Sequence, residues 1–161
     1  MDVRSYDPET DRSDLWKLKR AFETGLGTET GSDEKEATYE AKLTFEYRRR
    51  YLDWVERCVA DDPRCVTVAE DGELVGYVFV LPERLAMIWD AAVINELYVA
   101  SECRGTGVAD DLMNAACALA REQDLPIDRL VLDVDPENAR ARAFYDRHGF
   151  EAWGEMVARV L

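Results

Sequence analysis

The sequence predicts a mixed α/β fold in a single domain, and three observations lead to that prediction. The chain has 161 residues, 47% of them hydrophobic and 10% aromatic, which is the size and composition of one globular domain with its own core. An Asp-Gly pair between two β-rich segments indicates an antiparallel hairpin. After the hairpin, segments of helical and strand character alternate. This order is typical of a sheet packed against helices.

The first part of the chain predicts one short strand followed by helices. The strand is expected over residues 2–6 and a first helix over about 11–24. A second helical region is expected over 34–60, ending before Pro63, because proline cannot continue a helix. A flexible connection between the two helical regions is indicated by Gly25, Gly27, Gly31 and Ser32.

The second helical region is apolar on two sides, with a possible break near Arg48. A helix of this kind needs two partners, so we expect one side to cover the sheet and the other to contact a neighbouring helix. An acceptor pocket and a dimer interface are the alternatives. The two stripes are Ala41, Phe45, Leu52, Val55 and Val59, and Leu43, Tyr47, Tyr51, Trp54 and Cys58.

The second part of the chain predicts strands that alternate with helices. Two strands, 65–69 and 74–81, flank the turn at Asp71-Gly72. The elements expected beyond them are a long strand over 86–100, a helix from Gly107, a short buried strand over 129–134, a helix over 138–148 and a final strand over 150–161.

The charge of the chain excludes several classes of partner. Acidic residues number 34 and basic residues 20, so the formal net charge is −14. A field of this sign repels nucleic acid and anionic membrane surfaces. Only four of the basic residues are lysines, and the acids are spread along the whole chain. We interpret this composition as adaptation to high salt, with ordinary solubility as the alternative.

Other sequence features favour a cytoplasmic protein without a metal site. The first residues are acidic and lack the apolar stretch of a signal peptide. The four cysteines form no CxxC pair and have the spacing of neither a zinc site nor a disulfide framework. The single histidine, His148, lies near the end of a predicted helix, where we expect a structural role.

The most informative segment is 97–109, where a predicted strand leads through a glycine-containing loop into a helix. The N-terminus of a helix presents backbone N–H groups and a partial positive charge. Gly105 and Gly107 would let a phosphate approach the backbone closely. The loop therefore has the properties of a pyrophosphate cradle, although an unoccupied strand-to-helix turn has the same pattern.

Two common phosphate loops are excluded by their own requirements. A Walker-type triphosphate loop ends in Gly-Lys-Ser/Thr, and this segment has no such ending. A dinucleotide-binding loop needs glycine at position 110, which is Asp here. The pattern that stands at residues 104–109, Arg-x-x-Gly-x-Ala, resembles the acetyl-CoA signature of the GNAT superfamily of N-acetyltransferases. Residues 138–150 resemble the second hallmark of that family, Asn-x-x-Ala-x-x-Phe-Tyr-x-x-x-Gly-Phe, at every fixed position.

The resemblance is close over residues 64–161 and looser before them. It implies a central, mostly antiparallel sheet with a splayed parallel pair and helices on both faces. It also implies that residues 1–62 shape the acceptor site and that residues 64–161 form the acetyl-CoA-binding core of one domain, 1–161. The residues that it places at the cofactor are Leu97, Tyr98, Val99, Arg104, Gly105, Thr106, Gly107, Val108, Ala109, Asn138, Ala141, Phe144 and Tyr145.

The reaction that the resemblance implies needs an acid and favours a base. An alkylammonium of pKa ~10.4 is deprotonated in about one part in 2,500 at pH 7, so a carboxylate that takes the proton would help. Glu96, on the strand before the loop, is our first candidate, and Asp90 on the same predicted strand is the second. By resemblance, Tyr145 would lie near the thioester sulfur and protonate the leaving thiolate.

One feature departs from the expected cradle. Asp110 and Asp111 lie in the first turn of the helix that should meet a pyrophosphate, where their charge competes with it. Arg140, Arg142 and Arg147 are candidates for contact with the 3′-phosphate of CoA.

The sequence thus predicts an acetyl-CoA-dependent N-acetyltransferase that acts by direct attack in a ternary complex, with no metal. The acceptor would be an amine on a small molecule, a peptide or a protein, and residues 23–62 would shape its pocket. A non-catalytic acyl-CoA-binding sensor is the alternative. A homodimer is a further expectation, from the two-sided helix.

Overall fold

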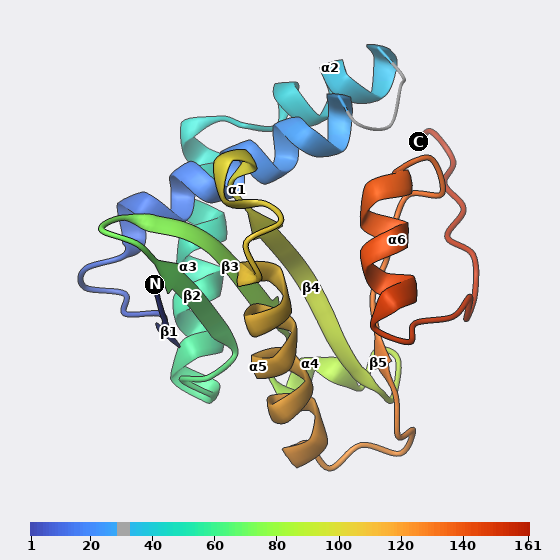
Figure 1. The fold of residues 1–161 in the computed structure, drawn as a ribbon. Helices are drawn as coiled ribbons and strands as arrows, with labels where there is room; N and C mark the ends of the chain where they lie inside the picture. Colours follow the sequence, from blue (N-terminus) through green and yellow to red (C-terminus); the bar gives the residue numbers. More distant parts are fainter. Residues whose placement is uncertain (29–32) are drawn as a thin grey trace.

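A five-stranded sheet organises the computed structural model, which describes residues 1–28 and 33–161 (Figure 1). The strands lie in chain order; the first four pair antiparallel, and the last two pair parallel. This arrangement confirms the predicted mixed α/β fold with one parallel pair. The strands are β1 (Asp2–Ser5), β2 (Val66–Glu70), β3 (Leu74–Val80), β4 (Ala92–Val99) and β5 (Leu130–Val131).

Helices cover both faces of the sheet. Successive strand residues point to opposite faces, so Gly76 and Phe79 of β3 lie on different sides. The Phe79 ring packs 5.1 Å from the Trp54 ring, and a Cβ on Gly76 would lie 3.2 Å from Leu112 Cδ1. Every residue of β3 is buried as a result. The helices are α1 (Arg12–Thr28), α2 (Asp33–Ala41), α3 (Phe45–Asp61), α4 (Glu83–Ala86), α5 (Val108–Glu122) and α6 (Ala139–Arg147).

The second helical region is two helices rather than one. It breaks at residues 42–44, upstream of the expected position at Arg48, because the Thr44 side chain accepts a hydrogen bond from Tyr47 N (3.1 Å) and caps α3. Phe45 is 81% exposed, so its place in an apolar stripe was wrong. Further along, α3 contacts both the sheet and a neighbouring helix, but residues of one predicted stripe make both contacts. The Trp54 ring packs on Phe79 of the sheet, and the Tyr51 ring lies 6.3 Å from Trp16 of α1.

Several predicted boundaries were wrong. α1 continues to residue 28 and includes Gly25 and Gly27, while Gly31 and Ser32 lie outside the described residues. The strand expected over 86–100 begins only at Ala92, because α4 and a turn come first. The strand expected over 129–134 has two half-buried residues, Leu130 and Val131.

The final strand expected over 150–161 is also absent. Residues 151–161 are exposed coil, and the segment runs back along α6 (Figure 1). A strand forms only where a neighbour supplies hydrogen bonds, and β5 is too short to offer an edge of matching length. Among the described residues, no helix is long and apolar enough to cross a membrane.

Candidate functional site

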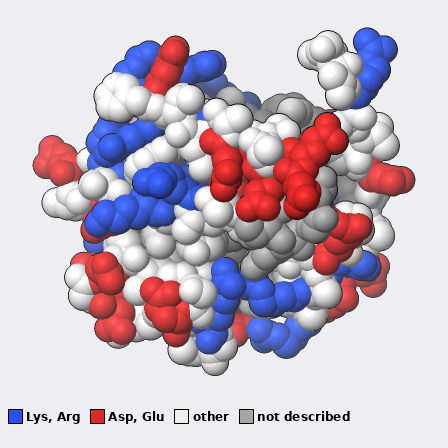
Figure 2. All heavy atoms as spheres, turned by 90° about the horizontal axis from the view of Figure 1, so that it is seen from above, with Lys and Arg blue, Asp and Glu red and all other residues white. Residues whose placement is uncertain are grey.

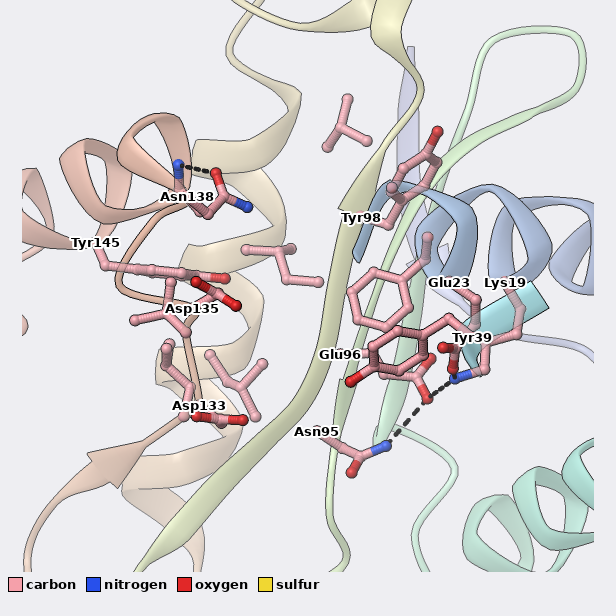
Figure 3. A pocket seen from close by; sticks show the side chains of 18 of the residues that line it. Lys19, Glu23, Tyr39, Asn95, Glu96, Tyr98, Asp133, Asp135, Asn138 and Tyr145 are labelled. Atoms are coloured by element: carbon pink, nitrogen blue, oxygen red, sulfur yellow. Dashed lines mark hydrogen bonds and ion pairs between the residues drawn. The ribbon is translucent and has the colours of Figure 1, made fainter. Parts of the chain in front are cut away.

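A deep cleft lies between β4 and β5. The two strands pair at Ala92–Leu130 and Val93–Val131, and beyond these pairs they diverge. The space between them forms a cleft of about 1570 Å³ that reaches α1, α2, α3 and α6. Figure 3 shows Asp133, Asp135 and Tyr145 on one wall, and Glu96, Lys19 and Tyr39 on the other.

A β-bulge shapes the β4 wall of this cleft. The register between β3 and β4 shifts, so that Val80 faces Ile94 while Phe79 faces Glu96. Asn95 is therefore an extra residue in β4, and its side chain is exposed where it lines the cleft. The bulge leaves the Glu96 side chain on the face covered by α1 and α3.

The Glu96 carboxylate is buried and receives four donors. Its Oε1 accepts from Lys19 Nζ at 2.8 Å and from Asn95 Nδ2 at 3.1 Å. Its Oε2 accepts from the hydroxyls of Tyr51 at 2.9 Å and Tyr77 at 2.6 Å. Burial, followed by the Glu96 charge, raises the pKa of both tyrosines well above their ordinary value, so that both stay protonated donors. These four donors thus fix the position of the Glu96 side chain at the wall of the cleft.

Sequence reasoning missed the cation that balances this carboxylate. Lys19 of α1 is 3% exposed and also lies 2.5 Å from Glu23 Oε1, so one ammonium bridges two buried carboxylates. Burial lowers the pKa of Lys19, but the charges of Glu96 and Glu23 outweigh it and raise that pKa. The helical spacing from Leu15 placed Lys19 and Glu23 on the buried face of α1 and could have shown them.

Asp90, the second candidate base, does not lie on the strand as expected. It occupies the turn before β4 with a positive φ of 55°. Its carbonyl accepts a hydrogen bond from Ile127 N at 2.8 Å, and it is not among the residues that line the cleft. Of the two candidates, the structure brings only Glu96 to the site.

The loop between β4 and α5 has the geometry of an anion cradle. Gly105 and Gly107 have φ values of 77° and 95°, which an L-residue adopts only with strain. A Cβ on either glycine would project into open space. Within the described part of the chain, the backbone N–H groups of residues 105–110 donate to no acceptor. Six donors at a helix N-terminus, with open space beside them, form a site suited to a phosphate.

Neighbouring residues fix the position of this loop. Arg104 Nε donates to the carbonyl of Val99 at 3.1 Å, and its guanidinium lies 5.8 Å from the centre of the Tyr98 ring. The Thr106 hydroxyl donates to the Cys103 carbonyl at 2.6 Å. Val108 is 1% exposed, so its side chain belongs to the core and only its backbone faces the loop. The predicted cofactor residues Leu97, Tyr98, Val99, Gly105, Gly107 and Ala109 line the cleft, as does Arg104.

Helix α6 supplies the opposite wall. Asn138 caps the helix, accepting from Ala141 N at 3.1 Å. Phe144 and Tyr145 follow on the face that lines the cleft, with ring centres 5.4 Å apart. Burial raises the pKa of Tyr145 to about 12, and Arg140 lowers it by a smaller amount. Tyr145 is therefore a protonated hydroxyl at neutral pH.

Asp110 is turned toward α6. Its Oδ1 lies 2.7 Å from both Arg147 Nη1 and His148 Nε2. The hydrogen bond from Arg147 lowers the pKa of Asp110, as does the one from His148 to a smaller extent. Arg147 of α6 and His148 at the C-cap of this helix thus both contact the Asp110 carboxylate beside the cradle, and His148 joins α5 to the end of α6. In the described ranges, no group of three or more His, Cys, Asp or Glu side chains has an arrangement that could hold a metal ion.

Relatives at moderate identity are N-acetyltransferases. The chain is 35% identical over 93 residues to a 5-NmdU N-acetyltransferase of Pseudomonas phage PaMx11, covering 57% of this chain and 61% of that protein. It is 33% identical over 102 residues to an uncharacterized N-acetyltransferase of Mycobacterium tuberculosis, covering 62% and 61% of the two chains. The chain therefore spans about three fifths of the length of these relatives.

A solved structure shares the fold of this chain, and a family model matches its sequence. A PaiA N-acetyltransferase from Thermoplasma acidophilum, solved in complex with coenzyme A, superposes with a TM-score of 0.72 at 18% identity, over 93% of this chain and 89% of that one. The model of the acetyltransferase (GNAT) family matches residues 28–150. The chain therefore belongs to the acetyltransferase (GNAT) family.

Proposed function

We propose that this protein transfers the acetyl group of acetyl-CoA to an amine by direct attack within a ternary complex. One observation carries the proposal: a single cleft has an anion cradle at one end and, on opposite walls, a buried carboxylate and a protonated tyrosine. Family membership supports acetyl transfer as the chemistry. Residues 1–62 would shape the acceptor side and residues 64–161 the cofactor side.

The residues of the cradle fit a pyrophosphate. The N–H groups of residues 105–110 would donate to its oxygens, because they donate to no acceptor in the described part of the chain. The main chain of Leu97 and Val99 faces the diverging side of β4, where an extended pantetheine arm would lie as an added strand. Asn138, Ala141 and Phe144 would border that arm from α6. Acetyl-CoA supplies the thioester.

Two side chains carry the proton transfers in this proposal. Glu96 accepts the proton that the amine loses as it forms the new C–N bond. Its carboxylate is already surrounded by four donors, so the entering amine displaces the exposed Asn95 amide from Oε1. Tyr145 donates its proton to the sulfur as the C–S bond breaks. Water then takes the proton from Glu96 and restores the one on Tyr145. Holding both reactants in one cleft provides a large part of the rate.

The experiment is thiol release from acetyl-CoA across a panel of amines. Tyr145→Phe should lower kcat about a hundredfold and leave the KM for acetyl-CoA within about twofold. Glu96→Gln should lower kcat/KM for the amine about a hundredfold. Phe45→Leu, at an exposed position on α3, is the matched control. Full activity in the Tyr145 and Glu96 variants would overturn the assigned roles.

The alternative function is a non-catalytic acyl-CoA sensor. The observation that favours it is the saturation of Glu96 by four protein donors, which suits a structural carboxylate. A sensor would bind CoA saturably and release no thiol with any amine. Its CoA affinity would also be unaffected by Tyr145→Phe.

High salt is the condition in which we propose to look for activity. A net charge of −14 supports this, since a polyanionic cofactor must approach an acidic protein. Figure 2 shows that basic side chains nevertheless gather on one part of the upper face and acidic ones on another. At 1 M salt the Debye length is about 3 Å, so long-range repulsion fades while direct N–H contacts persist.

A further inference from the structure

An ammonium group already occupies the acceptor side of the cleft. Lys42 Nζ lies 4.7 Å from the centre of the Tyr39 ring and 5.4 Å from the centre of the Tyr47 ring. It also lies 2.7 Å from Glu23 Oε2. Two aromatic faces and a carboxylate around one ammonium are the chemistry by which proteins recognise alkylammonium ligands. We call Glu23, Tyr39 and Tyr47 the ammonium cage.

The buried charges next to the ammonium cage require a balancing cation inside it. Glu23, Lys19 and Glu96 are each less than 5% exposed, and together they carry a net charge of −1. A buried charge without a partner is strongly destabilising, so a second cation must balance the group. Lys42 supplies it from the cleft side.

The contact that Lys42 makes is one that a ligand can replace. Glu23 Oε2 is buried and accepts no hydrogen bond from the described residues, so its contact with Lys42 is an ion pair without hydrogen-bond geometry. The Lys42 side chain is 37% exposed, whereas that of Lys19 is 4% exposed. Lys42 can therefore move into water on its flexible stem, and Lys19 cannot.

The cage and the predicted base belong to one continuous network. Lys19 contacts both Glu23 of the cage and Glu96, so this one side chain connects the cage to the predicted base. All of these side chains line the same cleft. A molecule with an amine at Glu96 can thus extend a second group toward Glu23 (Figure 3).

We propose that the ammonium cage binds a second, non-reacting ammonium group of the acceptor, and that Lys42 fills the cage until the acceptor arrives. The acceptor class is then a linear aliphatic diamine: one amine reacts as the free base, and the other stays charged between Tyr39, Tyr47 and Glu23. This inference rests on the proposed acetyl transfer and adds the acceptor class to it.

The kinetic test compares two acceptors of equal carbon length, 1,4-diaminobutane and butylamine, at saturating acetyl-CoA. Lys42→Met removes the competing ammonium and should lower the KM for the diamine about threefold, with butylamine unchanged. Glu23→Gln should raise the KM for the diamine about tenfold more than it changes the KM for butylamine. Lys17→Met and Glu40→Gln, both at exposed positions, are matched controls. Equal effects on the two amines, or no effect in either variant, would overturn the inference.

Two further measurements keep the outcomes separate. Because Glu23 is buried and its variant can fail to fold, Tyr39→Leu removes one face of the cage from the half-buried surface of α2 and should also weaken the diamine selectively. Calorimetry with 1,4-diaminobutane alone, without acetyl-CoA, should show binding that Lys42→Met tightens about threefold. If the diamine binds in this way and no amine is acetylated, the proposed function fails and the cage stands. If amines are acetylated and the diamine has no advantage, the cage fails and the proposed function stands.

Discussion

Replacement of Lys19 by Met tests whether one buried ammonium balances the two carboxylates of the site. Lys19 lies 2.5 Å from Glu23 and 2.8 Å from Glu96, and all three side chains are at most 4% exposed. Methionine has a similar volume and preserves the packing on α1, so that the main loss is the charge. Two carboxylates would then lie buried close to each other, with Lys42 countering only Glu23.

The size of the effect follows from that burial. Removal of one partner of a buried ion pair costs about 3–5 kcal/mol, and the help from Lys42 favours the lower end. We expect a loss of about 3 kcal/mol in the free energy of unfolding, or roughly 10 °C in Tm for a domain of this size. Lys17→Met is the matched control, because its side chain is 69% exposed and its loss should stay within about 0.5 kcal/mol.

The assay is urea denaturation between pH 5 and pH 8, and at alkaline pH. In Lys19→Met, one of the two buried carboxylates would take up a proton on folding, because its balancing ammonium is gone. The free energy of unfolding of this variant should therefore rise as the pH falls toward 5. In the unchanged protein the raised pKa of Lys19 means that the folded state holds this proton more tightly. The contribution of Lys19 to the free energy of unfolding is therefore complete below about pH 10.4, the pKa of lysine in the unfolded chain. This contribution is lost as the pH rises above that value.

Two results would refute this reasoning. One is a loss of less than about 1 kcal/mol in Lys19→Met, which would mean that the carboxylates do not depend on the lysine. The other is a loss that is the same at pH 5 and pH 8. Addition of Glu96→Gln to the variant should restore part of the stability, because it removes one of the uncompensated charges.

Three further predictions concern other parts of the site. Gly107→Ala forces alanine to a φ of 95° and adds a methyl group to the cradle, so calorimetry should show CoA binding weakened about tenfold; unchanged affinity would place the pyrophosphate elsewhere. Asp110→Asn weakens the contacts with Arg147 and His148, so amide exchange in α6 should quicken, and equal exchange rates would contradict this. Gly76→Ala places a Cβ 3.0 Å from the Tyr98 carbonyl oxygen and should cost about 1–3 kcal/mol in urea denaturation, whereas an unchanged midpoint would disprove the close contact.

Local patterns in the sequence were enough for the fold class and for the cradle. The turn at Asp71-Gly72, the strand-to-helix loop at 104–109 and the helix that Asn138 caps all depend on residues that are neighbours in the chain. The limits of β4 and β5 were predicted poorly, because the length of a strand depends on the edge that its neighbour offers. The same reason accounts for the absence of the strand expected over 150–161.

The sequence by itself determined the family and the position of Glu96 next to the cradle, since both follow from the order of residues along β4 and the loop. Only the tertiary structure decided what surrounds Glu96. Lys19 and Tyr51 are 77 and 45 residues away from it in the chain, and burial of α1 and α3 against the same face of the sheet brings them into contact with it. A carboxylate in a low-dielectric interior needs such partners, and no local pattern identifies which distant side chains supply them.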